Sequence, residues 1–460
     1  MSTKLKYRSY SNDLQKTEKK SVRHSFILVD KHDPDRLLKL GIWAYFFLLI
    51  FEGALRKWFL PGLAAPLLII RDPLAIWLIV LSWKQGLLPR TSYLSVVILI
   101  GIISIFTALF FGHGSLVVAL YGARILLIHF PFIFVIGSVF SREDVVKIGL
   151  ITLWIAIPMA VLIGLQFYSP QSAWVNRGVG GDMEGAGFSG ALGYFRPSGT
   201  FSFTNGNTLF FSFLACYVFY FWLSKDTINR LVLICATVAL LASIPLSISR
   251  TLFFSVGVSL FFALIAISGK PQYWGKMLLA AISLVVLLVI LGQASFFQTA
   301  TEAFSTRFES ASNVEGGLEG TLGERYIGGM LNSILNALDK PFFGYGIGMG
   351  TNAGSQLLTG ERAFLIAEGE WPRLIGELGP FFGLTFIFIR LGICVEIALA
   401  SYQKMRRGDF LPWLLLSFGL LNVPQGQWAQ PTALGFGVLI GGLMIASLHR
   451  QKPISRPSVN

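Results

Sequence analysis

The stretch SYLSVVILIGIISIFTALFF, residues 92–111, contains no charged side chain. A helix of about 20 predominantly apolar residues is long enough to cross the hydrocarbon core of a bilayer. Similar stretches recur near residues 40–59, 62–83, 116–139, 146–168, 207–224, 229–249, 251–268, 275–292, 374–399, 410–424 and 431–448. The sequence therefore predicts an all-α polytopic membrane protein with about twelve transmembrane helices.

The composition of the whole chain agrees with that class. Of the 460 residues, 54% are hydrophobic and 13% are charged, and the mean hydropathy is +0.65. A soluble domain usually has about 25% charged residues, so a soluble globular enzyme is excluded. The three cysteines, Cys216, Cys235 and Cys394, all fall in apolar stretches. They are expected to be buried small hydrophobes and not disulfides or metal ligands.

The basic residues follow a pattern that sets membrane orientation. The net charge of +13 could indicate a nucleic-acid partner, but the Lys and Arg residues lie between the apolar stretches, which argues against one. Residues 1–39 contain ten of them, and every second connection between predicted spans is basic. Cytoplasmic connections of membrane proteins carry this excess. Both termini are therefore predicted to be cytoplasmic, with no nucleic-acid binding.

This orientation divides the chain into five regions. A basic cytoplasmic tail over 1–39 precedes nine spans over 40–292, a large external loop over 293–373, three spans over 374–450 and a second tail over 451–460. A second long outer connection covers roughly 169–206. The large loop contains a predicted amphipathic helix, which should lie along the membrane surface or pack on the mouth of the bundle. Thr321 and Glu324 have capping-box spacing, a periodic apolar face runs to Leu338, and Asp339 and Pro341 end it.

Seven arginines fall in the outer connections or at the mouths of spans, where Lys and Arg are disfavoured. They are Arg177, Arg196, Arg250, Arg307, Arg325, Arg362 and Arg373. Any one of them could pair with a lipid headgroup or a loop carboxylate. As a set they favour an anion site, because a guanidinium can bind phosphate through two parallel hydrogen bonds.

Charged residues also interrupt the apolar stretches, namely Glu52, Arg56, Arg71, Asp72, Arg124 and Arg390. A charge at the bilayer centre costs at least ~2.5 kcal/mol, so each needs a partner or a polar cavity. Glu52 and Arg56 are four residues apart and could pair along one helix face. Structural pairing and a ligand-lining role remain alternatives for the group.

Two further features of the large loop bear on chemistry. Residues 341–350 carry four alternating glycines, which indicates either a loop packed tightly on the bundle or amides that approach a diphosphate. No histidine lies in the loop, so its candidate general bases are carboxylates: Glu368, Glu370 and Glu377. For Glu377, a role at the start of the following helix is favoured.

Four segments, in order, resemble the O-antigen polymerase and O-antigen ligase superfamily of bacterial surface-polysaccharide glycosyltransferases. They are Phe195-Arg-Pro-Ser-Gly-Thr-Phe201 followed by Asn205 and Asn207, Ser247-Ile-Ser-Arg250, the helix from Arg325 followed by Lys340-Pro-Phe-Phe-Gly-Tyr-Gly-Ile-Gly348, and Glu377-Leu-Gly379 followed by Gly383. The resemblance covers roughly residues 190–390. The upstream block Phe51-Glu-Gly-Ala-Leu-Arg-Lys-Trp58 resembles a subgroup of the same proteins.

The resemblance implies a metal-independent glycosyltransferase without a cofactor, which uses a polyprenyl-diphosphate-linked glycan donor at the outer face of the bacterial inner membrane. Arg196, Arg250 and Arg325 would bind the diphosphate, with Arg373 beside them. Glu368 would take the proton from the acceptor hydroxyl, and Glu370 is the second candidate for that role.

Three functions remain open. A polymerase would join lipid-linked repeat units, and a ligase would move a finished glycan to a lipid core or protein acceptor. Family ligases commonly carry His-Asn where this chain has Glu368 and Gly369, a departure that leaves room for a polymerase subgroup. A transporter or flippase of lipid-linked sugars is the third, although no repeat of two similar halves is visible. Membrane lipid, a chain-length regulator and a flippase are the expected further partners.

Overall fold

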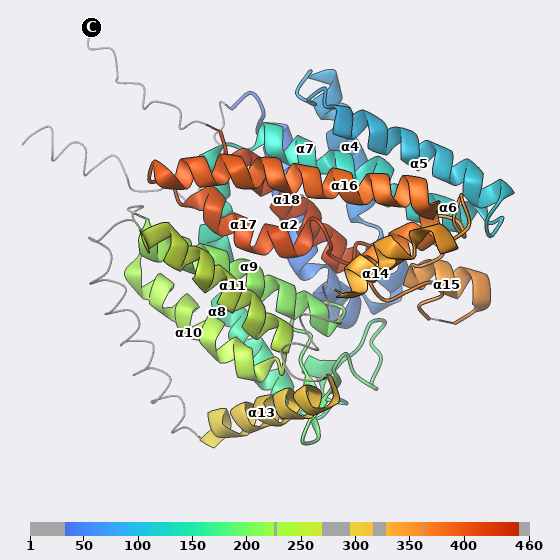
Figure 1. The fold of residues 1–460 in the computed structure, drawn as a ribbon. Helices are drawn as coiled ribbons and strands as arrows, with labels where there is room; N and C mark the ends of the chain where they lie inside the picture. The colour runs from blue at the N-terminus through green and yellow to red at the C-terminus, as the bar shows by residue number, and fades with distance from the viewer. Residues whose placement is uncertain (1–32, 225–227, 269–294, 316–327, 362, 450–460) are drawn as a thin grey trace, which may run out of the picture.

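The computed structural model describes residues 33–224, 228–268, 295–315, 328–361 and 363–449 (Figure 1). Eight helical segments are long and apolar enough to cross a membrane, and three apolar helices are shorter. Each of these eleven coincides with a predicted span, so the all-α membrane class is confirmed. The predicted span near 275–292 lies outside the described residues, and the total of twelve is not confirmed.

The first five spans occupy the N-terminal third of the chain, and two of them contain a π-helical turn. In order, the elements are α2 (Arg36–Ala54), the π-helix η1 (Leu55–Phe59), η2 (Pro61–Leu63), α3 (Ala64–Leu68), α4 (Arg71–Lys84), α5 (Ser92–Phe110), α6 (Leu116–Arg124), the π-helix η3 (Ile125–His129), α7 (Phe130–Val139) and α8 (Arg142–Tyr168). Side-chain hydrogen bonds cap the N-termini of several of these helices. Ser141 and Asp144 form a capping box at α8.

The remaining elements include one hairpin and the helices of the large loop. They are η4 (Trp174–Asn176), β1 (Phe188–Ala191), β2 (Tyr194–Arg196), α9 (Thr204–Leu223), α10 (Arg230–Leu246), α11 (Arg250–Ser268), α13 (Ser295–Glu315), α14 (Gly329–Leu335), η7 (Ala337–Asp339), α15 (Asn352–Thr359), α16 (Glu370–Arg406), α17 (Leu411–Asn422) and α18 (Pro431–Ser447). The strands β1 and β2 pair antiparallel.

Helix α18 forms the centre of the bundle and packs most extensively against α7 and α17. It carries no charge and is buried along almost its whole length. A Cβ added at Gly437 or Gly442 would collide with Trp428 or Ile136. Small residues therefore let α18 approach its neighbours closely, which is how helices associate where no hydrophobic force drives them together.

Basic connections gather at one end of the bundle. Lys39 at the start of α2 pairs with Asp144 at 3.1 Å, and Arg142 pairs with Asp409 at 2.9 Å. Lys404 donates to the carbonyl of His449 at 3.0 Å. The start of α2, the α7–α8 and α16–α17 connections and the end of α18 therefore share one end. Which side of a membrane this end faces stays a prediction.

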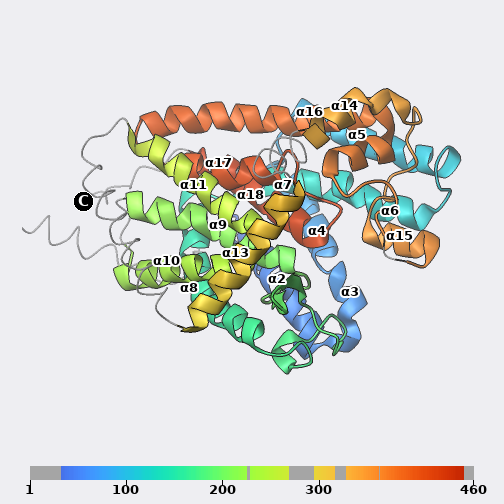
Figure 2. The ribbon, with the colours of Figure 1, turned by 60° about the horizontal axis from the view of Figure 1, so that its bottom comes forward.

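The long connections lie elsewhere on the bundle. In Figure 1, α14 and α15 lie at the opposite end from the C-terminal end of α16. Helix α13 lies outside the bundle and crosses the spans obliquely (Figure 2). Of the predicted amphipathic helix, α14 and η7 form the C-terminal part and end at Asp339 as expected, with Leu335 and Leu338 exposed. Its capping box lies outside the described residues.

Candidate functional site

Helix α16 is broken at Gly379, where the backbone adopts φ 78° and ψ 170°. Pro380 follows and has no amide hydrogen to donate. The break frees the carbonyls of Gly376 and Glu377, which accept hydrogen bonds from the amides of Tyr345 at 2.7 Å and Gly346 at 3.2 Å. At membrane depth such freed groups need partners within the protein. The glycine-rich loop 341–350 supplies them.

The alternating glycines of this loop are required by close approach and by backbone angle. Gly344, Gly346 and Gly348 have φ of 70°, 107° and 93°, a region that favours glycine. A Cβ at Gly344 would collide with the backbone of α16, and one at Gly348 with the backbone of α6. The interpretation of residues 341–350 as a tightly packed loop is confirmed.

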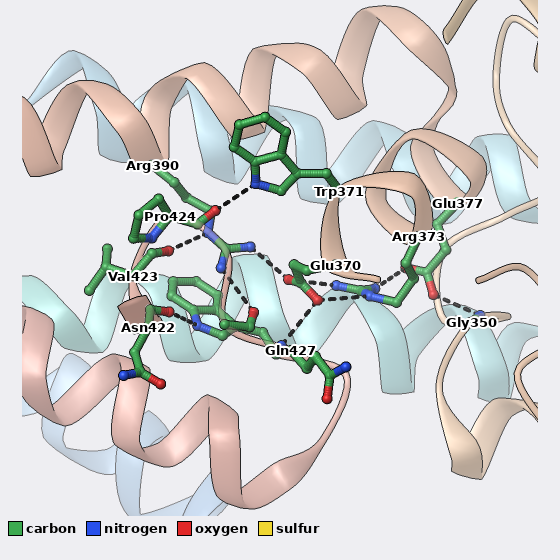
Figure 3. A network of polar contacts seen from close by, with 12 residues as sticks. Gly350, Glu370, Trp371, Arg373, Glu377, Arg390, Asn422, Val423, Pro424 and Gln427 are labelled. Atoms are coloured by element: carbon green, nitrogen blue, oxygen red, sulfur yellow. Dashed lines mark hydrogen bonds and ion pairs between the residues drawn. The ribbon is translucent and has the colours of Figure 1, made fainter. Parts of the chain in front are cut away.

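Glu370, at the start of α16, lies at the centre of a buried ion-pair network (Figure 3). Its Oε1 accepts from Nη2 of Arg373 at 3.0 Å and from Nη1 of Arg390 at 2.6 Å. Its Oε2 accepts from Nε of Arg373 and from the backbone amide of Trp428, both at 3.1 Å. Both carboxylate oxygens are therefore engaged, and the group is poorly placed to take a proton from a substrate.

The remaining contacts of the network balance its charge. Arg373 also donates to Glu377 at 2.6 Å, and the other Glu377 oxygen accepts from the Gly350 amide at 2.8 Å. Arg390 donates to the carbonyl of Val423 and lies over the Trp428 ring, 3.9 Å from its centroid. Two arginines and two glutamates neutralise one another, so Arg373 is held in the structure and its guanidinium is occupied. The favoured role of Glu377 in securing the start of α16 agrees with these contacts.

Glu368 has a different environment, although it is only two residues from Glu370. Its side chain is exposed, and it directly precedes Gly369, the residue before α16. Its main-chain carbonyl accepts from Nε2 of Gln427 at 3.0 Å. In the described part of the chain no hydrogen bond or ion pair engages its carboxylate. Glu368 is therefore the predicted base that remains available to a substrate.

Arg196 and Arg250 end two segments that pack together, and Arg307 lies on α13, which contacts the hairpin that contains Arg196. Arg196 is the last residue of β2 and Arg250 the first of α11. At Gly190 of the paired strand, an added Cβ would meet Ile248 and lie 3.5 Å from the Arg196 side chain. The hairpin therefore rests on the Ser247-Ile-Ser-Arg250 segment. We call Arg196, Arg250 and Arg307 the arginine cluster; Arg325 lies outside the described residues.

Helix α13 brings Arg307 to the cluster by packing against α11 and the hairpin. Phe253 of α11 contacts Phe304 and Phe308, with ring centroids 6.0 and 6.3 Å apart. Helix α13 also contacts β1. Arg307 is one of the seven arginines in the predicted outer connections, but it is not part of the predicted diphosphate site. The sequence does contain a signal for Arg307. It stands where arginine is disfavoured, and the aromatic residues beside it anchor its helix.

The arginine cluster groups positive charges around the half-buried Arg196 guanidinium. Burial lowers the pKa of the Arg196 guanidinium from its ordinary value, and the positive charges of Arg307 and Arg250 lower it further. Among the described residues, no carboxylate pairs with Arg196 or Arg307, and Nε of Arg196 is buried without a hydrogen-bond partner. Grouped positive charges and a buried hydrogen-bond donor without a partner are features of an anion-binding site.

The charges inside the N-terminal spans are paired with one another. Glu52 contacts Arg56 at 3.3 Å, as its spacing predicted, and Arg71 at 3.1 Å. Asp72 contacts Arg124 and His129, both at 2.8 Å. With Arg390 in the α16 network, all six charges in the apolar stretches have partners, which favours structural pairing over a ligand-lining role. Sequence reasoning did not identify His129.

The fold and these contacts define the class: a helical multi-pass membrane protein with a broken helix, a neutral buried ion-pair network and a separate cationic cluster at its long connections. The chain matches no protein-family model, no curated protein and no solved structure.

Proposed function

We propose that this protein is a membrane glycosyltransferase that polymerises polyprenyl-diphosphate-linked repeat units into a surface polysaccharide. The observation that supports the proposal is the arginine cluster: the hairpin that ends at Arg196 packs on the segment that ends at Arg250, and α13, which carries Arg307, contacts both the hairpin and α11. A diphosphate carries several negative charges on acceptor oxygens. Grouped guanidinium groups bind such an anion with charge-assisted hydrogen bonds.

In the proposed reaction an acceptor hydroxyl oxygen attacks the anomeric carbon of the donor sugar. The new glycosidic C–O bond forms as the bond between the anomeric carbon and the diphosphate oxygen breaks. The electron pair of that bond leaves with the polyprenyl diphosphate, and the hydroxyl proton passes to the Glu368 carboxylate. Arg196 and Arg250 stabilise the charge that develops on the leaving diphosphate.

The environments of the carboxylates support this assignment of roles. Glu368 is exposed, whereas both oxygens of Glu370 are engaged by Arg373, Arg390 and Trp428. A general base needs an open position on its oxygen within hydrogen-bond reach of the acceptor. We therefore propose Glu368 as the base and assign Glu370 to the structural network.

Deletion of the gene in its own host, followed by gel analysis of surface glycans, tests the proposal. Loss of a polymerase leaves single repeat units on their acceptor, because ligation continues. Loss of a ligase leaves no glycan on the acceptor and accumulates long lipid-linked chains. An unchanged distribution of glycan chain lengths would contradict the proposed function.

A further inference from the structure

The turn that follows Arg196 is held by a segment about 140 residues earlier in the chain. Thr200 donates to the carbonyl of Ile50 at 2.6 Å, and Nη1 of Arg56 donates to the Ser202 hydroxyl at 3.0 Å. A Cβ at Gly53 would collide with the backbone at Thr200 and Ser202. The end of α2 and the π-helix η1 therefore lie directly against residues 198–202.

Lys57 makes the most unusual of these contacts. It is 1% exposed, and its ammonium donates to the Ser198 hydroxyl at 2.9 Å and to the Gly199 carbonyl at 2.6 Å. The ammonium also lies over the Trp58 ring, 4.6 Å from its centroid. Within the described ranges no carboxylate pairs with it. Its amino group is therefore buried against neutral oxygen atoms and an aromatic ring.

Other groups complete the enclosure of the same turn. Gln166 accepts from the Gly199 amide at 2.7 Å and donates to the Gly199 carbonyl at 3.1 Å. Nδ2 of Asn207 donates to the Pro197 carbonyl at 3.4 Å. Gly199 has φ 59°, and the Phe201 amide donates to the Ser198 carbonyl at 3.1 Å, which closes a turn there. Residues 197–200 are thus fixed through their backbone, directly next to Arg196.

The free-energy cost of burying the Lys57 amino group indicates a role beyond packing. An amino group buried without a carboxylate partner loses most of its hydration, and an apolar side chain of similar length would fill the space without that cost. What the ammonium adds is two directed hydrogen bonds to Ser198 and Gly199. Those bonds constrain the backbone that presents the Arg196 guanidinium.

We propose that Lys57 is a positioning residue, which fixes the 197–200 turn so that Arg196 is held in place to bind a prenyl diphosphate. The inference rests on the proposed function, since it takes the arginine cluster as the diphosphate site. Lys57 acts through Arg196 and does not itself bind the ligand.

A double-mutant cycle tests this positioning role. The full-length protein in lipid nanodiscs is titrated with farnesyl diphosphate as the probe, for wild type, Lys57→Met, Arg196→Gln and the double variant. Lys57→Met is expected to weaken binding about 10–100-fold, the range measured for groups that orient metal ligands. In the Arg196→Gln background the same change should have no further effect, because the two residues act in series.

A matched control removes a charge from the opposite end of the bundle. Arg142→Met breaks the pair with Asp409 and should leave the affinity for farnesyl diphosphate unchanged. If Lys57→Met fails to fold, Ser198→Ala takes its place in the cycle, since it removes one acceptor and keeps the ammonium. Ser198→Ala should weaken binding less and in the same Arg196-dependent way.

The outcomes separate the two proposals. Equal weakening by Lys57→Met with and without Arg196 would overturn the positioning role, as would unchanged affinity in that variant, while leaving the diphosphate site intact. Unchanged affinity in Arg196→Gln would overturn the diphosphate site itself. Loss of affinity in Arg142→Met as well would show a general effect on folding and would also overturn the positioning role.

Discussion

At the scale of single residues, the structure separates side chains that look alike in sequence. Glu368 and Glu370 are two positions apart, yet one is exposed and the other is engaged by two arginines. The Glu52–Arg56 pair could be predicted from its spacing of four. The contact between Glu370 and Arg390 could not, because its partners lie 20 residues apart on either side of a helix break.

The two carboxylates should therefore respond differently to the same substitution. Glu368→Gln should fold normally and lower the rate of product formation about 10²–10⁴-fold, because a positioned base is lost. Glu370→Gln should destabilise the protein by about 3–5 kcal/mol, because Arg373 and Arg390 keep an uncompensated buried charge. Thermal unfolding in detergent, with turnover measured on the folded fraction, distinguishes the two. Near wild-type turnover in Glu368→Gln would remove Glu368 from the mechanism.

The arginine cluster should not tolerate lysine. Arg196→Lys and Arg250→Lys keep the charge but lose the planar pair of donors. Each change should lower turnover about 10²–10³-fold, as does loss of one donor that stabilises transition-state charge. Arg230→Lys, an exposed arginine at the start of α10, is the control and should retain full activity. Full activity in both cluster variants would be incompatible with a shared diphosphate site.

At the scale of elements, the junction between α16 and the loop 341–350 depends on complementary backbone groups. The sequence suggested that the glycine-rich segment packs on the bundle, but it could not show that the segment repairs a broken helix. That relation requires Tyr345 and Gly346 to meet carbonyls more than 30 positions later. The π-helical turns at Leu55–Phe59 and Ile125–His129 likewise had no signal in the apolar pattern.

Gly379→Ala tests the junction. The backbone angles at Gly379 are accessible almost only to glycine, and a Cβ would collide with the Phe342 carbonyl. The strain alone should cost about 1–3 kcal/mol, seen as a lower thermal unfolding midpoint. Gly257→Ala in α11 is the control, because its Cβ meets no described atom within 4 Å. That variant should be neutral or more stable by up to about 1 kcal/mol. Equal midpoints for both variants would contradict the account of the break.

At the scale of the whole molecule, hydropathy predicted the spans well. Every segment that crosses lipid must be a predominantly apolar helix that satisfies its own backbone hydrogen bonds. Even the three helices shorter than 18 residues coincide with predicted spans. The sequence could not predict how the long connections are placed in the tertiary structure. The convergence of Arg196, Arg250 and Arg307 depends on aromatic packing of α13 against α11, which periodicity within one helix does not reveal.

The orientation of the bundle can be measured by cysteine labelling in a background without Cys216, Cys235 and Cys394. Ser312→Cys on α13 should react with a membrane-impermeant maleimide in spheroplasts with intact inner membranes. Gln403→Cys, near the end of α16 where the basic connections gather, should react only after permeabilisation. The reverse pattern would invert the predicted topology and place the arginine cluster on the cytoplasmic side.

The most direct test of the central claim is the reconstituted reaction. The purified protein in lipid vesicles is supplied with a polyprenyl-diphosphate-linked oligosaccharide, and both the length of the glycan and the release of polyprenyl diphosphate are measured. A polymerase should release one polyprenyl diphosphate for each new glycosidic bond, and Arg196→Lys should abolish both signals together. Transfer of intact donor across the bilayer, with no diphosphate released and no longer glycan formed, would contradict the account and identify a transporter.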